Sequence, residues 1–300
     1  MATTLLRLTA LAVVLSSACA AQLATLRVDV NLVLVPVTVT DRSGRLITGL
    51  DRSRFKILEE GVPQDIASFS TEDLPVSIGL VLDVSGSMRQ KLATARAFLS
   101  ALLGGAEDRD ESLLLTCADR PDLQTGLTPD LERLSSLVRA TRSGGSTALI
   151  DTIYLSIERM RSARNSRKVL IVVSDGQDNF SRHTRSELIS RAIESEAQIY
   201  SIATPEPPHF QKAIELVDAN RGLILLQDLA HATGGIYLPL DAASSTTAVA
   251  ERLARTLHEQ YLIGYYARDP AQKGARRIQV RLDLPDVRLY SRSHSNSPLP

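Results

Sequence analysis

The chain has 300 residues, of which 44% are hydrophobic and 23% are charged, fractions that are ordinary for a globular protein. These values exclude a wholly disordered chain, and the counts of 16 glycines, 13 prolines and 2 cysteines exclude a collagen-like or disulfide-scaffold protein. The 34 basic residues balance the 34 acidic residues, which argues against a nucleic-acid partner, because such binders usually carry a basic excess. With no tryptophan and 4% aromatic residues, a platform for stacking bases or sugars is not expected.

Residues 1–21 have the pattern of a secretory signal peptide. An arginine precedes the apolar run 8–15, and Ala18 and Ala20 provide the small residues that signal peptidase accepts. We therefore expect an exported protein that is periplasmic, envelope-associated or secreted, with a helix of the mature fold or a lipid-modified Cys19 as the alternatives. The apolar run is shorter than the about 20 residues that span a bilayer. No later segment is long and apolar enough either, so we expect no integral membrane span.

Residues 22–74 are predicted to form an N-terminal β region. The segment VDVNLVLVPVTVTD alternates in the manner of a strand. The side chains expected on one face of this strand are Val28, Val30, Leu32 and Leu34. Two further short segments, FKILEEG and DIASFS, are also strand-like, so the region predicts a small antiparallel β unit.

Residues 75–260 alternate apolar strands with amphipathic helices. The runs 76–84 and 168–175 are almost continuously apolar, which is typical of strands that are buried on both faces. Further strands are expected at ESLLLTC, AQIYSIA and IYLPL. Helices are expected at 88–103, 131–140, 148–161, 186–194, 226–233 and 247–260. This alternation predicts an α/β fold with a doubly wound, mostly parallel sheet.

Residues 261–291 contain two more strand-like segments, YLIGYYA and RRIQVRLDL. We expect these C-terminal β strands to pair with the N-terminal β region. Both chain ends would then build one small antiparallel β unit, with the α/β domain inserted in it. The last residues, 292–300, are polar and contain proline, which predicts a disordered tail.

Polar side chains gather where two of the buried strands end. The first strand ends in D-V-S-G-S, which contains Asp83, Ser85 and Ser87. The second strand ends at Asp175, and the sequence G-G-S-T between them ends at Thr147. Ligands of doubly wound sheets bind outside the carboxyl ends of the strands, and carboxylate and hydroxyl oxygens suit Mg²⁺, Mn²⁺ or Ca²⁺. With only two acids, a bound cation would keep positive charge and an open position that an external carboxylate could fill.

This pattern resembles the metal-ion-dependent adhesion site of the von Willebrand factor type A domain. The resemblance rests on D-x-S-x-S after the first strand, on Thr after a glycine pair and on Asp in V-S-D-G after a later strand. It implies that Ser85 and Ser87 ligate a divalent cation, Mg²⁺ before Mn²⁺ or Ca²⁺, and that Thr147 binds it directly or through water. Asp83 and Asp175 are implied to act through water and to hold the serine hydroxyls.

The flanking segments are similar to a narrower family, the exported bacterial VWFA-related proteins of the acidobacterial type. The similar segments are VTVTDRSGRLITGLDRSRFKILEEGVPQDIASF, LAHATGGIYLP and EQYLIGYYA, which together extend over nearly all of the chain after residue 21. With the adhesion-site resemblance, they imply an exported, non-enzymatic binding or adhesion module. Such a module captures an Asp or Glu carboxylate of a protein partner through the cation.

Two other functions stay open. A metal-dependent hydrolase of phosphate or peptide bonds would need a general base within reach of the metal. Against this alternative, the sequence contains no G-x-G-x-x-G after a strand, no G-x-x-x-x-G-K-[ST], no G-x-S-x-G and no H-E-x-x-H. A scaffold protein whose metal site is vestigial is the other alternative, and metal titration would separate it from the first two functions.

The polar residues at the strand ends also have plainer interpretations. Ser87 could cap the helix that follows it, and Ser146 or Thr147 could cap the next helix, although Thr147-Ala-Leu is the better match to the metal site. Asp178 is expected to be a solvated loop residue, and Asp151 a surface acid. The histidines show no ligand spacing, and we expect them to be surface or hydrogen-bonded residues: His183, His209, His231, His258 and His294. Removal of residues 1–21 would leave Cys117 alone, as an inert core residue.

Overall fold

The computed structural model describes residues 32–71, 73–204, 213–240, 245–268 and 274–296. The predicted signal peptide, 1–21, lies outside these ranges, as do Val28 and Val30 of the first predicted strand. Within the described ranges, no helix has the length and apolar character that a membrane crossing requires.

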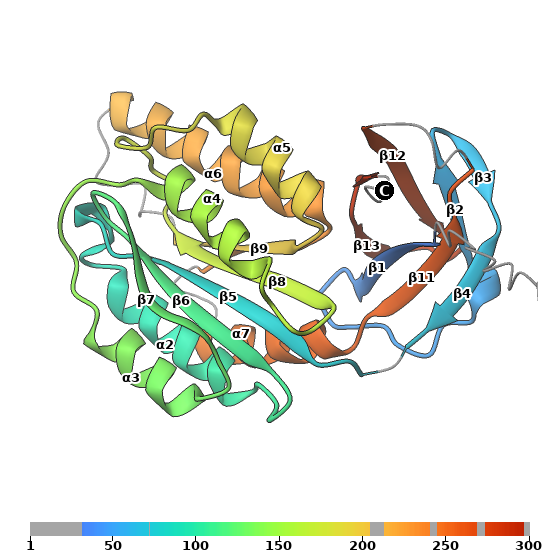
Figure 1. Cartoon of the computed structure of the whole chain (residues 1–300), viewed down its shortest axis with the longest axis horizontal. Coiled ribbons are helices and arrows are strands. Elements are labelled where there is room, and N and C mark those ends of the chain that lie inside the picture. The colour runs from blue at the N-terminus through green and yellow to red at the C-terminus, as the bar shows by residue number, and fades with distance from the viewer. Residues whose placement is uncertain (1–31, 72, 205–212, 241–244, 269–273, 297–300) are drawn as a thin grey trace, which may run out of the picture. The chain divides into compact units, whose positions relative to one another are not determined.

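A six-stranded sheet forms the centre of the α/β part of the chain (Figure 1). Its strand order is β10-β9-β8-β5-β6-β7, and every neighbouring pair is parallel except β6 and β7. The strands are β5 (Val76–Asp83), β6 (Glu111–Cys117), β7 (Pro121–Thr128), β8 (Arg167–Ser174), β9 (Gln198–Ala203) and β10 (Tyr237–Pro239). This arrangement confirms the predicted mostly parallel sheet.

Helices cover both faces of this sheet. On one face lie α2 (Leu92–Gly104), α3 (Leu131–Ala140) and α7 (Thr246–His258), and on the other lie α4 (Leu149–Met160), α5 (Arg185–Ser195) and α6 (Ala213–Thr233) (Figure 1). Two apolar clusters lie on opposite faces of the sheet, because successive side chains of a strand point to opposite faces. In β5, Leu80 and Leu82 belong to the first cluster and Val81 to the second. The strand is therefore buried on both faces, as its apolar run predicted.

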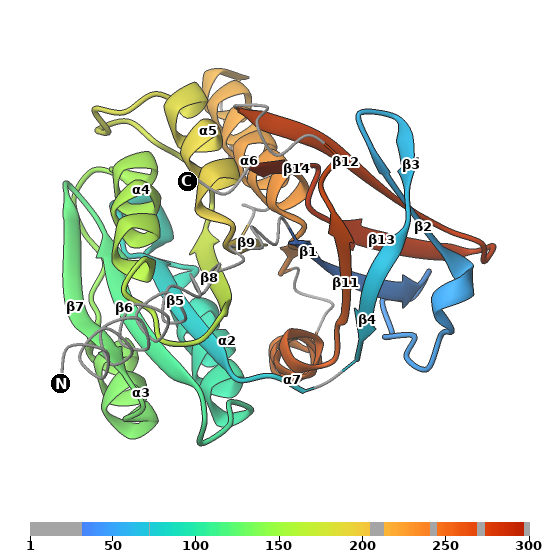
Figure 2. The same ribbon diagram turned by 45° about the vertical axis from the view of Figure 1, so that its right-hand side comes forward.

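Strands from both chain ends form the antiparallel β unit (Figure 2). One sheet has the order β13-β1-β11-β4 and the other the order β14-β12-β2-β3. The bounds are β1 (Leu32–Asp41), β2 (Phe55–Glu59), β3 (Val62–Gln64), β4 (Ile66–Ser70), β11 (Tyr261–Tyr266), β12 (Ala275–Leu282), β13 (Val287–Ser291) and β14 (His294–Asn296), with a short 3-10 helix, η1, at Arg52–Arg54. Because β1 pairs with β11 and β2 pairs with β12, the predicted pairing of the two chain ends is confirmed.

The structure shows which face of β1 is buried. Leu32 and Leu34, which were expected to share a face, lie on the more exposed one: Leu34 is 42% exposed and Leu32 is half-buried. The buried apolar side chains are Val33, Val35, Val37 and Val39. Both faces of this strand are apolar, so alternation alone does not show which face meets the second sheet.

Several element boundaries also differ from the sequence prediction. The helix expected at 88–103 begins only at α2, because residues 86–88 form the 3-10 helix η2 (Gly86–Met88). The helix expected at 226–233 extends over the whole of α6, and the antiparallel edge strand β7 was not predicted. In the predicted tail 292–300, residues 294–296 form β14, which pairs with β12, and 297–300 lie outside the described residues. The domain boundaries proposed after residues 74 and 260 stay predictions.

Candidate functional site

The end of β5 brings three of the predicted site residues together. The backbone N–H of Ser85 donates to Asp83 Oδ1 at 2.9 Å, and the hydroxyls of Ser85 and Ser87 lie 3.1 Å apart. The other carboxylate oxygen, Asp83 Oδ2, accepts the hydroxyl of Ser174 at 2.6 Å. Asp83 and Ser85 are buried and Ser87 is half-buried, so the hydroxyl pair lies at the surface end of a buried carboxylate.

The loop that ends at Thr147 is fixed against this segment by backbone hydrogen bonds. Gly144 donates to the carbonyl of Val84 at 2.8 Å, and Gly86 donates to the carbonyl of Gly145 at 3.0 Å. Gly145 has a φ of +83°, in the left-handed region where only glycine is unstrained. The glycine pair therefore allows the loop to approach the end of β5 and carries Thr147 with it.

Thr147 is also held by the loop that follows β8. Its N–H donates to the side-chain oxygen of Asn179 at 2.9 Å, and its carbonyl accepts the N–H groups of Asn179 and Phe180, both at 3.0 Å. Thr147 is buried, whereas Phe180 is exposed. The amide of Asn179 thus positions the backbone of a predicted metal-binding residue, although sequence analysis did not identify it.

Asp175 is the first residue after β8 and lies beside Asp83, because β8 and β5 are parallel neighbours. Its Oδ1 accepts the N–H of Gln177 at 3.1 Å, and its Oδ2 lies 2.6 Å from the ammonium of Lys91. The side chains of this ion pair are only 12% and 4% exposed. Lys91 is therefore a charged member of the site that the sequence analysis missed.

The charges of the two aspartates interact. The pKa of Asp83 is raised to about 6 because the carboxyl is buried and because the negative charge of Asp175 lies nearby. Hydrogen bonds from Ser174 and Ser85 act in the opposite direction and favour the ionised carboxylate. The negative charge of the two neighbouring carboxylates would favour a cation at this place.

The structure excludes the plainer interpretation of these hydroxyls as helix caps. The N-cap residues of α2 and α4 are Lys91 and Ala148, and neither makes a side-chain capping bond. The N-cap of η2 is Ser85, and it makes no such bond either. The first turn of α4 is capped instead by Asp178, whose Oδ1 accepts the N–H of Ile150 at 3.1 Å. Asp178 is therefore a structural capping residue and not the solvated acid that was expected.

The hydrogen bonds of Asp151 and the burial of Cys117 give both residues a structural role. Asp151 is a half-buried acid, and its carboxylate accepts the backbone N–H groups of Arg182 and His183, both at 3.0 Å. Cys117 is buried, and burial raises the pKa of its thiol. This agrees with the expectation of an inert core cysteine.

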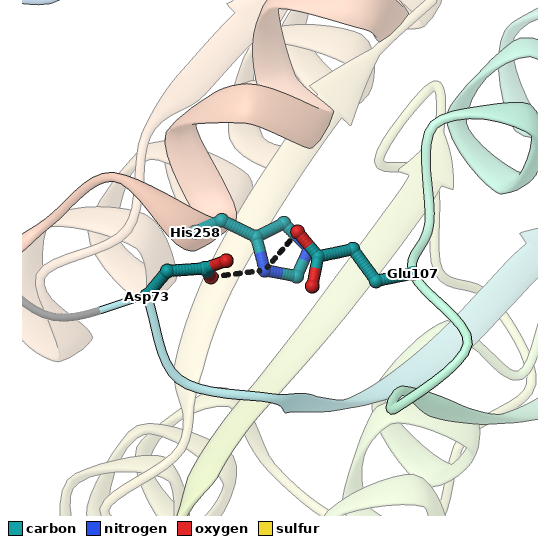
Figure 3. Close-up of side chains that lie close together, drawn as sticks. All are labelled: Asp73, Glu107 and His258. Carbon is teal, nitrogen blue, oxygen red and sulfur yellow. Dashed lines mark hydrogen bonds and ion pairs between the residues drawn. The ribbon is translucent and has the colours of Figure 1, made fainter.

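A second group of possible metal ligands was not anticipated. Asp73, Glu107 and His258 each place one ligand atom within 4.8 Å of the others (Figure 3). They come from three segments that are distant in the sequence, and Asp73 lies just before the first residue of β5, whereas Asp83 is the last residue of that strand. No local spacing signals such a group, which is why the histidine pattern did not show it.

The comparisons with known proteins agree with this fold. The family model described as von Willebrand factor type A domain matches residues 78–177, a range that contains all five predicted site residues. A solved structure described as von Willebrand factor type A from Catenulispora acidiphila is similar over 90% of this chain and 75% of that chain, with 13% identity and a TM-score of 0.50. At this identity the likeness shows the fold alone.

Two further solved structures are similar over a smaller part of the chain. The protein BatB from Bacteroides thetaiotaomicron has 20% identity and a TM-score of 0.48, over 60% of this chain and 98% of that chain. The vWF domain of the type V pili tip protein Mfa5 from Porphyromonas gingivalis has 15% identity and a TM-score of 0.48, over 62% of this chain and 95% of that chain. No curated protein matches the chain.

Proposed function

We propose that the protein is a cation-dependent binding module. The premise is that residues 78–177 of this chain form a von Willebrand factor type A domain. Two aspartates and three hydroxyl residues would hold one divalent cation, for which Mg²⁺ is the best fit: Asp83, Ser85, Ser87, Thr147 and Asp175. The cation would supply an open coordination position that takes an Asp or Glu carboxylate of a protein partner. The protein would act outside the cytoplasm, as the signal-peptide pattern of 1–21 predicts.

The observation that carries this proposal is the pair of hydroxyls beside the buried Asp83. Ser85 Oγ and Ser87 Oγ are 3.1 Å apart, and neither caps a helix. Hydroxyl and carboxylate oxygens are the ligands that Mg²⁺ prefers, and the donor set contains no sulfur or imidazole. Because the serine hydroxyls expected in direct contact are neutral and the two aspartates are expected to act through water, a bound Mg²⁺ would still attract an anionic group from outside.

A hydrolase would need a general base beside the cation, and the structure offers weak support for one. Three described histidines are hydrogen-bonded elsewhere: His183 to Asp151, His258 to Asp73, and His294 to Ser293. Asp175, which could serve as a base in principle, is ion-paired with Lys91. Binding without catalysis is therefore the function that we propose.

The ion pair between Lys91 and Asp175 favours one alternative, a scaffold protein with a vestigial metal site. The ammonium already neutralises one of the two carboxylates, as a metal ion would do. If it did so permanently, the domain would keep its fold without binding a cation. Metal affinity distinguishes this alternative from the proposed function.

The experiment is calorimetric titration of the full chain with Mn²⁺ and with Mg²⁺. We expect one ion per chain, and we expect Ser87→Ala to weaken its affinity at least about ten-fold, because this variant removes a ligand oxygen. The matched control is Ser162→Ala, which removes an exposed hydroxyl bonded to the carbonyl of Arg159. Equal affinity in the Ser87→Ala and Ser162→Ala variants would refute the site, and no saturable binding in the unaltered protein would favour the vestigial scaffold.

A second experiment tests capture of a carboxylate. Bound Mn²⁺ enhances the relaxation of water protons through the water at its open position. A short peptide with one Glu should reduce this enhancement, whereas the same peptide with Gln should not. An equal response to both peptides would count against carboxylate capture, and turnover of phosphate or peptide substrates with Mn²⁺ would favour the hydrolase.

A further inference from the structure

The group formed by Asp73, Glu107 and His258 lies where the α/β part of the chain begins and ends. Asp73 precedes β5, Glu107 lies in the loop between α2 and β6, and His258 is the last residue of α7 (Figure 3). The imidazole Nδ1 is 3.1 Å from Asp73 Oδ1 and 3.8 Å from Glu107 Oε1. One nitrogen and two carboxylate oxygens therefore converge from three separate elements.

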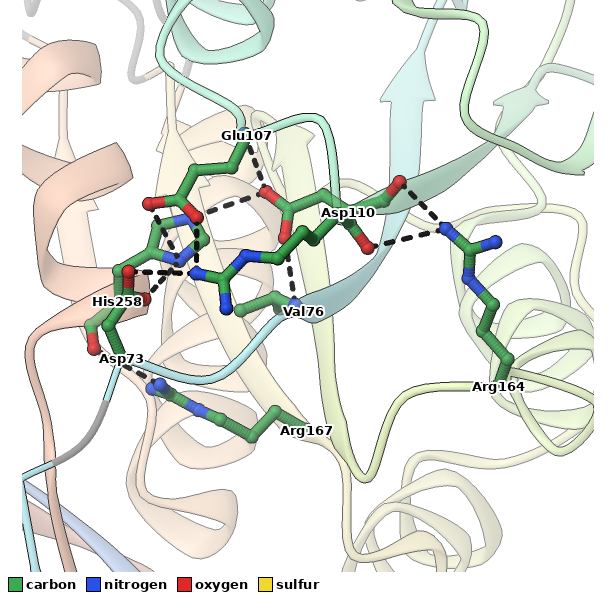
Figure 4. A network of polar contacts seen from close by, with 8 residues as sticks. Asp73, Val76, Glu107, Asp110, Arg164, Arg167 and His258 are labelled. Atoms are coloured by element: carbon green, nitrogen blue, oxygen red, sulfur yellow. Dashed lines mark hydrogen bonds and ion pairs between the residues drawn. The ribbon is translucent and has the colours of Figure 1, made fainter.

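A fourth residue fixes the orientation of the imidazole. Asp110 Oδ2 lies 3.2 Å from His258 Nε2, on the side of the ring opposite to Asp73 (Figure 4). Asp110 is itself held by two backbone N–H groups, from Val76 at 2.8 Å and from Glu107 at 2.9 Å. A carboxylate that binds one ring nitrogen so that the other faces outward is the usual support of a metal-bound histidine.

The neighbouring arginines leave the converging oxygens accessible. Arg109 donates to Asp73 Oδ2 at 2.9 Å and to Glu107 Oε2 at 2.8 Å, so it uses the oxygens that do not face the imidazole. The guanidinium of Arg167 donates to the backbone carbonyl of His258 at 3.2 Å. Each carboxylate thus keeps one oxygen directed at Nδ1, although the two positive charges oppose a cation there.

We propose that Asp73, Glu107 and His258 bind a divalent transition-metal ion of the zinc class. One imidazole nitrogen and two carboxylate oxygens suit Zn²⁺, and three protein ligands leave its fourth tetrahedral position open. On binding, the bond from the metal to Nδ1 replaces any proton there, and that proton passes to solvent. The contact with Asp110 keeps the proton on Nε2 of His258 and holds the ring in its orientation.

The distances from Nδ1 to the two carboxylate oxygens require only a small adjustment. Ligand atoms on tetrahedral zinc are about 3.3 Å apart, given metal–ligand bonds of about 2.0 Å. The Nδ1–Oδ1 distance of 3.1 Å already agrees with this value, and the Oε1 atom at 3.8 Å must move slightly closer. The side chains of Asp73 and Glu107 are 49% and 36% exposed, so both can move, whereas His258 is 8% exposed and fixed. The ion would connect the segment that enters β5 with the end of α7.

The experiment is titration of the full chain with Zn²⁺ in the Ser87→Ala background. That variant weakens the proposed adhesion site, so the outcome at His258 does not depend on whether the proposed function is correct. We expect one Zn²⁺ per chain and a rise in melting temperature that a chelator reverses. His258→Gln should weaken Zn²⁺ binding about 100-fold, and Arg109→Gln should tighten it several-fold because a positive charge is removed.

The matched control is His183→Gln. His183 also lies beside a carboxylate, at 2.7 Å from Asp151 Oδ1, but it belongs to no group of three ligands within the described residues. Its loss should leave the Zn²⁺ affinity unchanged. If His258→Gln does not fold, Asp73→Asn replaces it, since its exposed side chain allows a variant that keeps the fold. Zn²⁺ binding that is unchanged by both His258→Gln and Asp73→Asn, or an absence of saturable binding, would overturn the proposal.

Discussion

The ammonium of Lys91 lies 2.6 Å from Asp175 Oδ2, inside the group of residues that we assign to the adhesion site. This lysine supplies positive charge at a carboxylate that we propose as part of the metal site. Metal binding at the proposed site and the ion pair would therefore compete for the same carboxylate, and in the protein without metal the lysine compensates the charge of Asp175.

Replacement of Lys91 by Met should therefore strengthen metal binding and weaken the metal-free fold. We expect Mn²⁺ affinity to increase about ten-fold, because a positive charge in contact with a ligand carboxylate is removed. Without metal, two neighbouring carboxylates lose their compensating charge, and the free energy of unfolding should fall by about 2 kcal/mol. Calorimetry and chemical denaturation with and without Mg²⁺ measure both effects.

The control for this change is Lys168→Met, at the opposite end of β8. The ammonium of Lys168 contacts only a backbone carbonyl, that of Arg161, among the contacts found in the described residues. Its replacement should change neither Mn²⁺ affinity nor the response of stability to Mg²⁺. An unaltered Mn²⁺ affinity in Lys91→Met would show that the ion pair and the metal do not compete.

The loop that carries Asp175 should tolerate no side chain at Gly222. A Cβ atom at this residue of α6 would lie 2.2 Å from the carbonyl oxygen of Gly176, and Gly176 itself has a φ of +82°. Gly222→Ala should therefore push α6 away from the Asp175 loop and lower the free energy of unfolding by about 2 kcal/mol. Urea denaturation measures this loss.

Gly104→Ala is the matched control, because a Cβ atom there meets nothing within 4 Å at the end of α2. Alanine is also the better helix former, so stability should stay the same or rise slightly. If Gly222→Ala were as stable as Gly104→Ala, the close approach of the loop to α6 would not exist in solution.

Asn179 should influence metal affinity without being a ligand. Its side-chain oxygen accepts the N–H of Thr147 at 2.9 Å, so Asn179→Ala leaves that buried N–H unpaired and loosens the loop. We expect Mn²⁺ affinity to fall about five-fold, because Asn179 would position Thr147 in the way that residues hydrogen-bonded to a metal ligand orient that ligand. Titration calorimetry of the variant checks this.

The neighbouring Phe180→Ala is the matched control for Asn179→Ala. Phe180 is 60% exposed and shares only its backbone N–H with Thr147, so the variant should keep the full Mn²⁺ affinity. A similar loss of affinity in both variants would mean that the whole loop, and not the Asn179 amide, determines the position of Thr147.

The residues of the candidate site were predictable because their convergence follows from sheet topology. Asp83 and Asp175 end two apolar strands, and parallel strands that are neighbours bring their carboxyl ends to one edge. Lys91 was not predictable in this way. Its contact with Asp175 depends on how the turn after β5 is built, and a lysine near the start of a helix usually lies in solvent.

The position of His258 was predictable in part, but its contacts were not. His258 ends an amphipathic helix, whose side chains Leu253 and Leu257 lie in the core. Its partners Asp73 and Glu107 come from loops, and only the packing of α7 and α2 on the sheet brings them together. Periodicity describes the face of one element, so it cannot show a group that three elements share.

The face of β1 can be tested directly, since Val35 and Leu34 are adjacent and have opposite surroundings. Val35 is fully buried and pairs with Ile263 of β11, whereas Leu34 is 42% exposed. Val35→Ala should lower the free energy of unfolding by about 2 kcal/mol, and Leu34→Ala by no more than about 0.5 kcal/mol, although leucine loses more atoms. Urea denaturation of the two variants measures the difference. The reverse order would contradict the buried set Val33, Val35, Val37 and Val39, because a strand that slips by one residue exchanges all its faces.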